Sequence, residues 1–109
     1  MGFSGGGPYP NPAYQTSKGA VVNMTRALAV EWGPQQIRVN AVAPTWVRTD
    51  LTRPLFANNA IVAQLEGTMP LGRAADPEDM AGAILYLASR ASAMVTGHIL
   101  AVDGGYLAK

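Results

Sequence analysis

The chain has 109 residues and a formal net charge of +1; 49% of the residues are hydrophobic and 14% are charged, which predicts at most one soluble domain. The sequence has no basic stripe for nucleic acid, no apolar run near the ~18 residues that span a bilayer and no secretion signal, so we expect neither a nucleic-acid nor a membrane partner. Because it has no cysteine and a single histidine, His98, we expect no disulfide, no metal site and a cytoplasmic location.

The first predicted element is a helix that follows a glycine- and proline-rich opening loop over residues 2–12. Asn11 suits the N-cap and Pro12 suits the first helical position. The stretch from there to Trp32 has no further proline and is rich in alanine, valine and leucine. Gly33 and the following proline end the helix.

The remaining elements alternate between short apolar strands and helices. A buried strand is predicted over 37–43, closed by a proline, and a second strand over 98–102, stopped by a glycine pair. Between them lie a mixed stretch over 46–70, with a helix around 60–66, and a helix that starts at Asp76 and runs to Ser89. This alternation predicts an α/β fold with a parallel sheet. Such sheets need several strands, so residues 1–109 are expected to be part of a domain.

A tyrosine and a lysine four residues apart, Tyr14 and Lys18, are the main candidates for chemistry. Residues at this spacing share one helix face, with β-carbons about 5–6 Å apart. A free phenol titrates near ~10, and a neighbouring cation favours the phenolate. The pair could therefore exchange a proton with the oxygen of a carbonyl or an alcohol. This spacing alone is weak, because it also arises by chance on a solvated helix.

Further motifs along the whole chain strengthen this interpretation. The sequence resembles the C-terminal half of the short-chain dehydrogenase/reductase family, whose fold is a Rossmann-like, doubly wound parallel sheet. The matching pieces occur in the family's order: Tyr14-x-x-x-Lys18, Ile37-Arg38-Val39-Asn40-Ala41-Val42-Ala43-Pro44, Val47-Arg48-Thr49-Asp50, Pro70-Leu71-Gly72-Arg73, Asp76-Pro77-Glu78-Asp79, and Thr96-Gly97 leading to Val102-Asp103-Gly104-Gly105.

The resemblance implies roles for particular residues. Tyr14 would be the general acid/base, and Lys18 would tune it and bind the nicotinamide ribose of NAD or NADP. The segment from Pro44 through Thr45 to Thr49 would line the nicotinamide, with the Val47 main chain and the Thr49 hydroxyl meeting the carboxamide. Residues 50–69 would form a lid over the substrate. The implied substrate is a small secondary alcohol or its ketone, among sugar acids, polyols or 3-oxoacyl compounds.

The sequence also departs from the family pattern. Thr45 stands where the family usually has glycine. The glycine-rich dinucleotide loop and the catalytic serine would precede residue 1, and Ser4 lies too close to Tyr14 to take the serine's role. We therefore expect negligible turnover from residues 1–109 alone. A noncatalytic, truncated oligomerisation module is the alternative interpretation.

Three further features of the sequence bear on fold and function. Gly2-Phe3-Ser4-Gly5-Gly6 matches the nucleophile elbow of serine hydrolases, but an elbow needs a strand before the serine and a helix after it, and neither is predicted here. The helix over 12–32 is apolar nearly all round, which favours burial on more than one side. In the family this helix packs against another subunit, so a homo-oligomer, either a dimer or a tetramer, is expected. Asn40 is predicted to tie neighbouring backbone through its amide.

Overall fold

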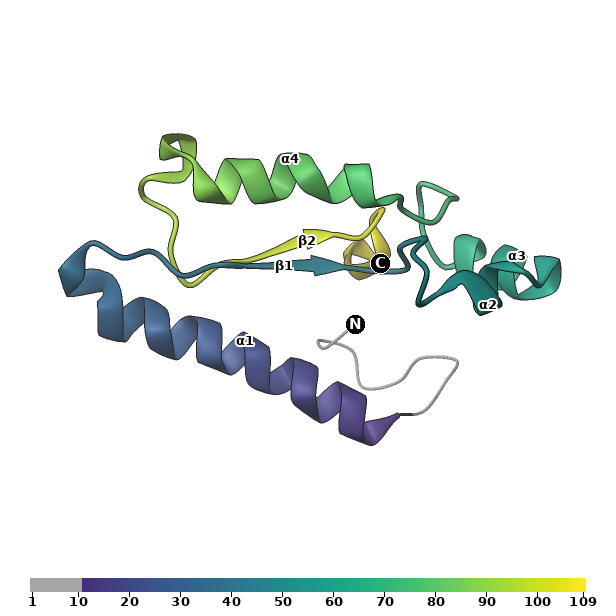
Figure 1. Cartoon of the computed structure of the whole chain (residues 1–109), viewed down its shortest axis with the longest axis horizontal. Coiled ribbons are helices and arrows are strands. Elements are labelled where there is room, and N and C mark those ends of the chain that lie inside the picture. Colours follow the sequence, from purple (N-terminus) through teal and green to yellow (C-terminus); the bar gives the residue numbers. More distant parts are fainter. Residues whose placement is uncertain (1–10) are drawn as a thin grey trace. The chain divides into compact units, whose positions relative to one another are not determined.

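The computed structural model describes residues 11–109, and its elements can be followed in Figure 1. Most of the predicted opening loop lies outside the described residues. The elements are α1 (Pro12–Trp32), a 3₁₀ turn (Gly33–Gln35), β1 (Ala41–Pro44), α2 (Arg53–Phe56), α3 (Asn59–Gly67), α4 (Pro77–Ala88), a 3₁₀ turn (Arg90–Ser92), β2 (Ile99–Val102) and a 3₁₀ turn (Tyr106–Ala108). No helix within residues 11–109 is long and apolar enough to cross a membrane.

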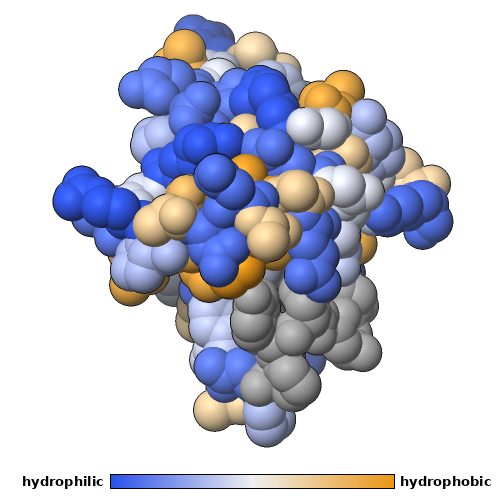
Figure 2. Space-filling model, turned by 90° about the vertical axis from the view of Figure 1, so that its right-hand side faces the viewer, coloured by the Kyte–Doolittle hydropathy of each residue, from blue (hydrophilic) through white to orange (hydrophobic). Residues whose placement is uncertain are grey.

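The chain forms two compact units. One contains the described residues up to Ala41 together with Leu87–Leu100, and the other contains Val42–Tyr86 and Ala101–Lys109. On the face drawn in Figure 2, hydrophilic and hydrophobic residues are interspersed.

Strands β1 and β2 pair side by side and run in the same direction (Figure 1). The Gly97 N–H donates to the Val39 carbonyl at 2.7 Å, and the Ala41 N–H donates to the His98 carbonyl at 2.9 Å. The predicted α/β fold with a parallel sheet is therefore confirmed. Strand β1 starts four residues later than expected, since the residues before it are joined to 95–97 largely through side chains.

Asn40 is one of those side chains. Its Nδ2 donates to the Val95 carbonyl at 2.9 Å, and its Oδ1 accepts from the His98 N–H at 3.0 Å. One half-buried amide thus satisfies a donor and an acceptor of the segment that leads into β2. The prediction that Asn40 ties neighbouring backbone is confirmed.

Helix α1 begins and ends as its sequence predicts. The Asn11 side chain accepts a hydrogen bond from the Tyr14 N–H at 3.0 Å, and a proline occupies the first turn. Gly33 is the C-cap, and the chain then turns through Gln36, whose φ is +61°. In this unit the face of α1 bearing Thr25 and Ala29 is buried.

The other unit has a small apolar core of Leu65, Met69 and Ala74, each almost fully buried. The glycine turn after β2 closes on this core, because the Leu71 N–H donates to the Gly104 carbonyl at 3.0 Å. The Asp103 carboxylate accepts from two following N–H groups at 2.9 and 3.0 Å. Residues 103–105 therefore form a structural turn.

The start of α4 is fixed by Asp79, which lies in its first turn. Its carboxylate accepts from the Asp76 N–H at 2.8 Å and from both terminal nitrogens of Arg73 at 2.7 and 2.9 Å. The Arg73 hydrogen bond, followed by the backbone hydrogen bond, holds the pKa of the Asp79 carboxyl well below its usual range. The same pairing raises the pKa of Arg73.

Candidate functional site

Tyr14 and Lys18 lie on one face of the first turns of α1. The Lys18 ammonium nitrogen is 5.3 Å from the centre of the Tyr14 ring. The Tyr14 side chain is 46% exposed and Lys18 is exposed as well, so both groups are accessible from solvent. The Asn11 cap and the bond from the Ser17 hydroxyl to the Tyr14 carbonyl, 2.8 Å, fix the backbone that carries the phenol. The predicted juxtaposition of phenol and amine is present.

The predicted cofactor segment follows β1 at the carboxyl end of the strand. Pro44 is the last residue of β1, and Val47 forms a parallel bridge with Ala75. That bridge is made by the residues on either side of Val47: the Ala75 N–H donates to the Trp46 carbonyl at 2.9 Å, and the Arg48 N–H donates to the Ala75 carbonyl at 2.8 Å. The bridge holds the segment in an extended conformation.

Thr52 organises the end of this segment, a role that is not among those predicted from the sequence. Its hydroxyl donates to the Val47 carbonyl at 2.6 Å and accepts from the Thr49 N–H at 2.9 Å. The Thr49 hydroxyl lies 3.2 Å from the same oxygen. A threonine three residues after Thr49 was the available signal, because threonine hydroxyls often bond to nearby backbone in turns.

Two polar groups of this segment have no hydrogen-bond partner among the described residues. The Thr45 hydroxyl oxygen is buried and unpaired. The N–H of Val47 points away from the Ala75 bridge and likewise has no bond within residues 11–109. Polar groups without a protein partner are normally satisfied by water or a ligand, so the Thr45 hydroxyl and the Val47 N–H are candidates for bonds to an external group. A donor and a hydroxyl beside a strand's carboxyl end suit a carboxamide such as that of nicotinamide.

The predicted site residues fall into the two units. Tyr14 and Lys18 belong to the unit that contains α1, whereas Thr45, Val47 and Thr49 belong to the unit that contains α2 and α3. The structure therefore brings Tyr14 and Lys18 together in one unit, and the residues of the cofactor segment together in the other. The role of each residue remains a prediction.

The predicted lid over residues 50–69 contains α2 and α3. Helix α2 has no buried residue, and Leu65 is the buried residue of α3. The Asn58 side chain caps α3 by accepting from two N–H groups at 3.0 and 3.2 Å. Helix α2, which buries no residue, can open at lower cost than the end of the segment, where Leu65 and Met69 belong to the core of the unit.

A small cavity of about 140 Å³ lies next to the cofactor segment within the same unit. Its lining includes Thr45, Arg73 and Asp79 on the polar side and Met69, Leu71 and Val102 on the apolar side. Its size suits a few water molecules rather than a substrate.

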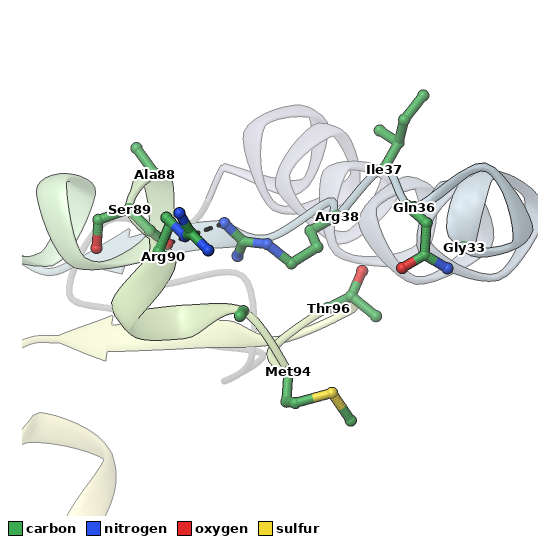
Figure 3. Close-up of a pocket in the computed structure, with 10 residues that line it drawn as sticks. Gly33, Gln36, Ile37, Arg38, Ala88, Ser89, Arg90, Met94 and Thr96 are labelled. Carbon is green, nitrogen blue, oxygen red and sulfur yellow. Dashed lines mark hydrogen bonds between the residues drawn. The ribbon is translucent and has the colours of Figure 1, made fainter.

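A larger cavity of about 310 Å³ lies among residues that precede the two strands (Figure 3). Arg38 reaches across it and donates to the Ser89 carbonyl at 3.2 Å, the dashed line in Figure 3, and to the Val95 carbonyl at 3.2 Å. It also donates to the Ser92 hydroxyl at 2.8 Å. Arg38 thus satisfies carbonyls beyond the C-terminus of α4, a structural role. Ligands of open α/β sheets bind at the opposite, carboxyl ends of the strands.

No group of three or more His, Cys, Asp or Glu side chains that could hold a metal occurs within residues 11–109. His98 is exposed and directly precedes β2.

Comparison with known proteins identifies the family. The family described as enoyl-(acyl carrier protein) reductase matches residues 1–107. Galactitol 2-dehydrogenase (L-tagatose-forming) of Cereibacter sphaeroides is 47% identical over 94 residues, covering 86% of this chain and 37% of that protein. D-arabinitol 2-dehydrogenase (ribulose-forming) of Candida albicans is 43% identical over 101 residues, covering 91% and 36%.

A solved structure gives the same result. A protein from Beutenbergia cavernae, named for an inferred NAD(P)-dependent gluconate 5-dehydrogenase activity and holding NADP at low occupancy, superposes with a TM-score of 0.91. It is 48% identical, and the match covers 99% of this chain and 43% of that one. The chain therefore spans well under half the length of these relatives. With a family match over nearly all of its residues, the chain belongs to the short-chain dehydrogenase/reductase family.

Proposed function

We propose that this chain carries the proton-transfer half of an NAD(P)-dependent oxidoreductase that interconverts a secondary alcohol and a ketone. The observation that supports this most is the Lys18 ammonium 5.3 Å from the Tyr14 ring, on a helix whose sequence matches the family. When bound, the nicotinamide accepts a hydride from the alcohol carbon or donates one to the ketone carbon.

Tyr14 moves the proton that balances this hydride. In the reductive direction its hydroxyl gives a proton to the carbonyl oxygen as the hydride arrives at carbon. In the oxidative direction the phenolate takes the proton from the alcohol. The adjacent ammonium of Lys18 stabilises the phenolate form electrostatically, and it can also donate hydrogen bonds to the ribose hydroxyls.

The cofactor-side segment supplies orientation. Pro44 and Thr45 line the nicotinamide, while the Val47 N–H and the Thr49 hydroxyl bind its carboxamide. This assignment is supported by the Val47 N–H and the Thr45 hydroxyl, which lack partners among the described residues. The bonds of Thr52 to the Val47 carbonyl and the Thr49 N–H support a preformed segment. Such preorganisation lowers the entropic cost of binding.

A polyol or a sugar acid is the proposed substrate class, supported by the names of the similar dehydrogenases. NAD or NADP is the proposed cofactor, and the cytoplasm is the proposed location. These assignments concern the activity of a whole protein. The matched relatives are considerably longer than the present chain.

The test is an assay of carbonyl reduction, in which consumption of NADPH or NADH is monitored by its fluorescence. The chain is assayed alone and together with the N-terminal portion of the Cereibacter galactitol dehydrogenase. In the preparation that turns over, Tyr14→Phe should lower kcat by about 10²–10⁴-fold, the usual contribution of general acid–base catalysis. Tyr106→Phe is the matched control, because Tyr106 also has a lysine near its ring, Lys109 at 5.6 Å.

Tyr106→Phe should leave kcat unchanged. Equal losses in the two variants, or no reduction in either preparation, would overturn the proposal.

A noncatalytic oligomerisation module is the second candidate. It is favoured by large apolar side chains on the outside of α1 and α4, among them Val30, which is 80% exposed. Exposed apolar side chains on helices can be covered by a protein partner. Light scattering should give a dimer or a tetramer for the native chain and a monomer for Val30→Glu.

Met94→Glu is the control for this experiment, because Met94 is 96% exposed but lies outside both helices. A native chain that scatters as a monomer would contradict the oligomer.

A further inference from the structure

Arg48 lies between two proposed cofactor-binding residues, Val47 and Thr49, yet its side chain turns to the predicted lid. Its Nη2 is 2.8 Å from Oε1 of Glu66, which belongs to α3. Its guanidinium carbon lies 4.8 Å from the centre of the Phe56 ring, which belongs to α2. One side chain therefore contacts both helices of the lid. The planar guanidinium suits this, because it can stack on a ring and bond to a carboxylate at once.

Glu66 connects Arg48 to a third segment, which contains Ala74. The same Oε1 accepts from the Ala74 N–H at 3.3 Å, one residue before the Ala75 bridge to the cofactor segment. The Arg48 backbone joins that bridge through the 2.8 Å bond from its N–H to the Ala75 carbonyl. Arg48 is thus fixed at its backbone and extends its charged end to α2 and α3.

Other anchors of the lid within residues 42–86 are the buried Leu65 and Met69 and the hydrogen bonds of Thr52 to the cofactor segment. Helix α2 buries no residue, and α3 buries Leu65 near its C-terminal end. The Arg48 and Glu66 side chains are 45% and 25% exposed, so their attraction is only partly screened by solvent. Arg48 adds to these anchors a charged contact that reaches both α2 and α3 from one side chain.

We propose that Arg48 is a positioning residue that fastens α2 and α3 to the cofactor segment and sets how often the lid opens. The inference rests on the proposed function only for the names lid and cofactor segment. Opening of residues 53–67 requires the guanidinium to leave both Glu66 and Phe56 and Leu65 to leave the core, while β1 and the Ala75 bridge stay in place. Closure re-forms one ion pair and one ring contact.

Hydrogen–deuterium exchange on the full chain without cofactor tests this directly. Arg48→Met should raise the opening constant of residues 53–67 by about 3- to 10-fold, the range expected for one partly exposed ion pair and one cation–π contact. Exchange in α1 and β2 should stay unchanged. Arg53→Met is the matched control, because Arg53 pairs with Asp50 on the same segment but both side chains are largely exposed. It should change nothing.

The dependence of exchange on salt concentration distinguishes the contribution of the ion pair from that of the packing of the arginine side chain. At about 1 M salt the Debye length falls to about 3 Å, so exchange of 53–67 should rise in the native chain. In Arg48→Met and in Glu66→Gln it should already be high and should not respond to salt. Glu66→Gln keeps an acceptor for the Ala74 N–H, so loss of that bond would not explain its effect.

Unchanged exchange in Arg48→Met, or an equal rise in α1 and β2, would overturn the inference. Failure of NADPH to bind would count against the proposed function and leave this result standing.

Discussion

Replacing Gly97 with alanine should destabilise the chain more than the same change at Gly72. Both glycines have a positive φ, +72° and +70°, a conformation that L-residues adopt at a cost. They differ in surroundings. A β-carbon at Gly97 would lie 3.3 Å from the β-carbon of Ala29 in α1, whereas one at Gly72 would meet nothing within 4 Å. The pair therefore separates backbone strain from side-chain crowding.

The magnitudes follow from these two terms. Strain should cost about 1–2 kcal/mol at either position. Crowding should add about 1–3 kcal/mol at Gly97 alone, because Ala29 is buried and its helix must shift to make room. We expect a loss of about 1–2 kcal/mol for Gly72→Ala and about 2–5 kcal/mol for Gly97→Ala.

Urea unfolding followed by circular dichroism measures both losses in the free energy of unfolding. The comparison is valid where the slope against urea is the same for all three proteins. Equal losses in the two variants would refute the close packing of α1, the helix that carries Tyr14, on residue 97.

Three further changes test local features. Asp79→Asn should reduce the loss of stability in acid. The pKa of Asp79 is depressed in the folded chain, so its contribution to stability is complete above a pH of about 3.8, the pKa of the unfolded carboxyl, and is lost as the pH falls toward the folded pKa. Thermal melts across that pH range should show a smaller drop in melting temperature for the variant than for the native chain. Asn40→Ala should cost about 1–3 kcal/mol in urea unfolding, because a backbone donor and acceptor lose their partner; an unchanged midpoint would contradict the two bonds. Thr45→Val should raise the melting temperature slightly by removing an unpaired buried hydroxyl; a lower value would show that the hydroxyl is bonded in solution.

The sequence predicted the helices well because their end signals are local. The Asn11 cap, the Pro12 first turn and the proline at the start of α4 each act within a few residues, and the structure has them in place. Strand β1 was predicted too long since β-branched residues at 37–39 have strand propensity. There the bonds depend on residues 95–98, more than fifty positions away.

The candidate site was predictable where spacing alone fixes geometry. Tyr14 and Lys18 share a helix face, so four residues of separation suffice. Thr52 and Arg48 were not identified because their importance depends on tertiary partners: the Val47 carbonyl for one, and Glu66 for the other. The unpaired hydroxyl of Thr45 was equally hidden, although its departure from the family's glycine marked the position.

The most direct test of the account compares kcat at saturating cofactor for Tyr14→Phe, Lys18→Met and the double variant. Saturation removes the contribution of Lys18 to cofactor binding, leaving its effect on the phenol. If the amine acts through the phenol, the double variant should be about as slow as Tyr14→Phe alone, because residues that act as a unit are strongly non-additive. If the two losses multiply instead, the groups act independently and the proposed proton transfer by a coupled pair is wrong.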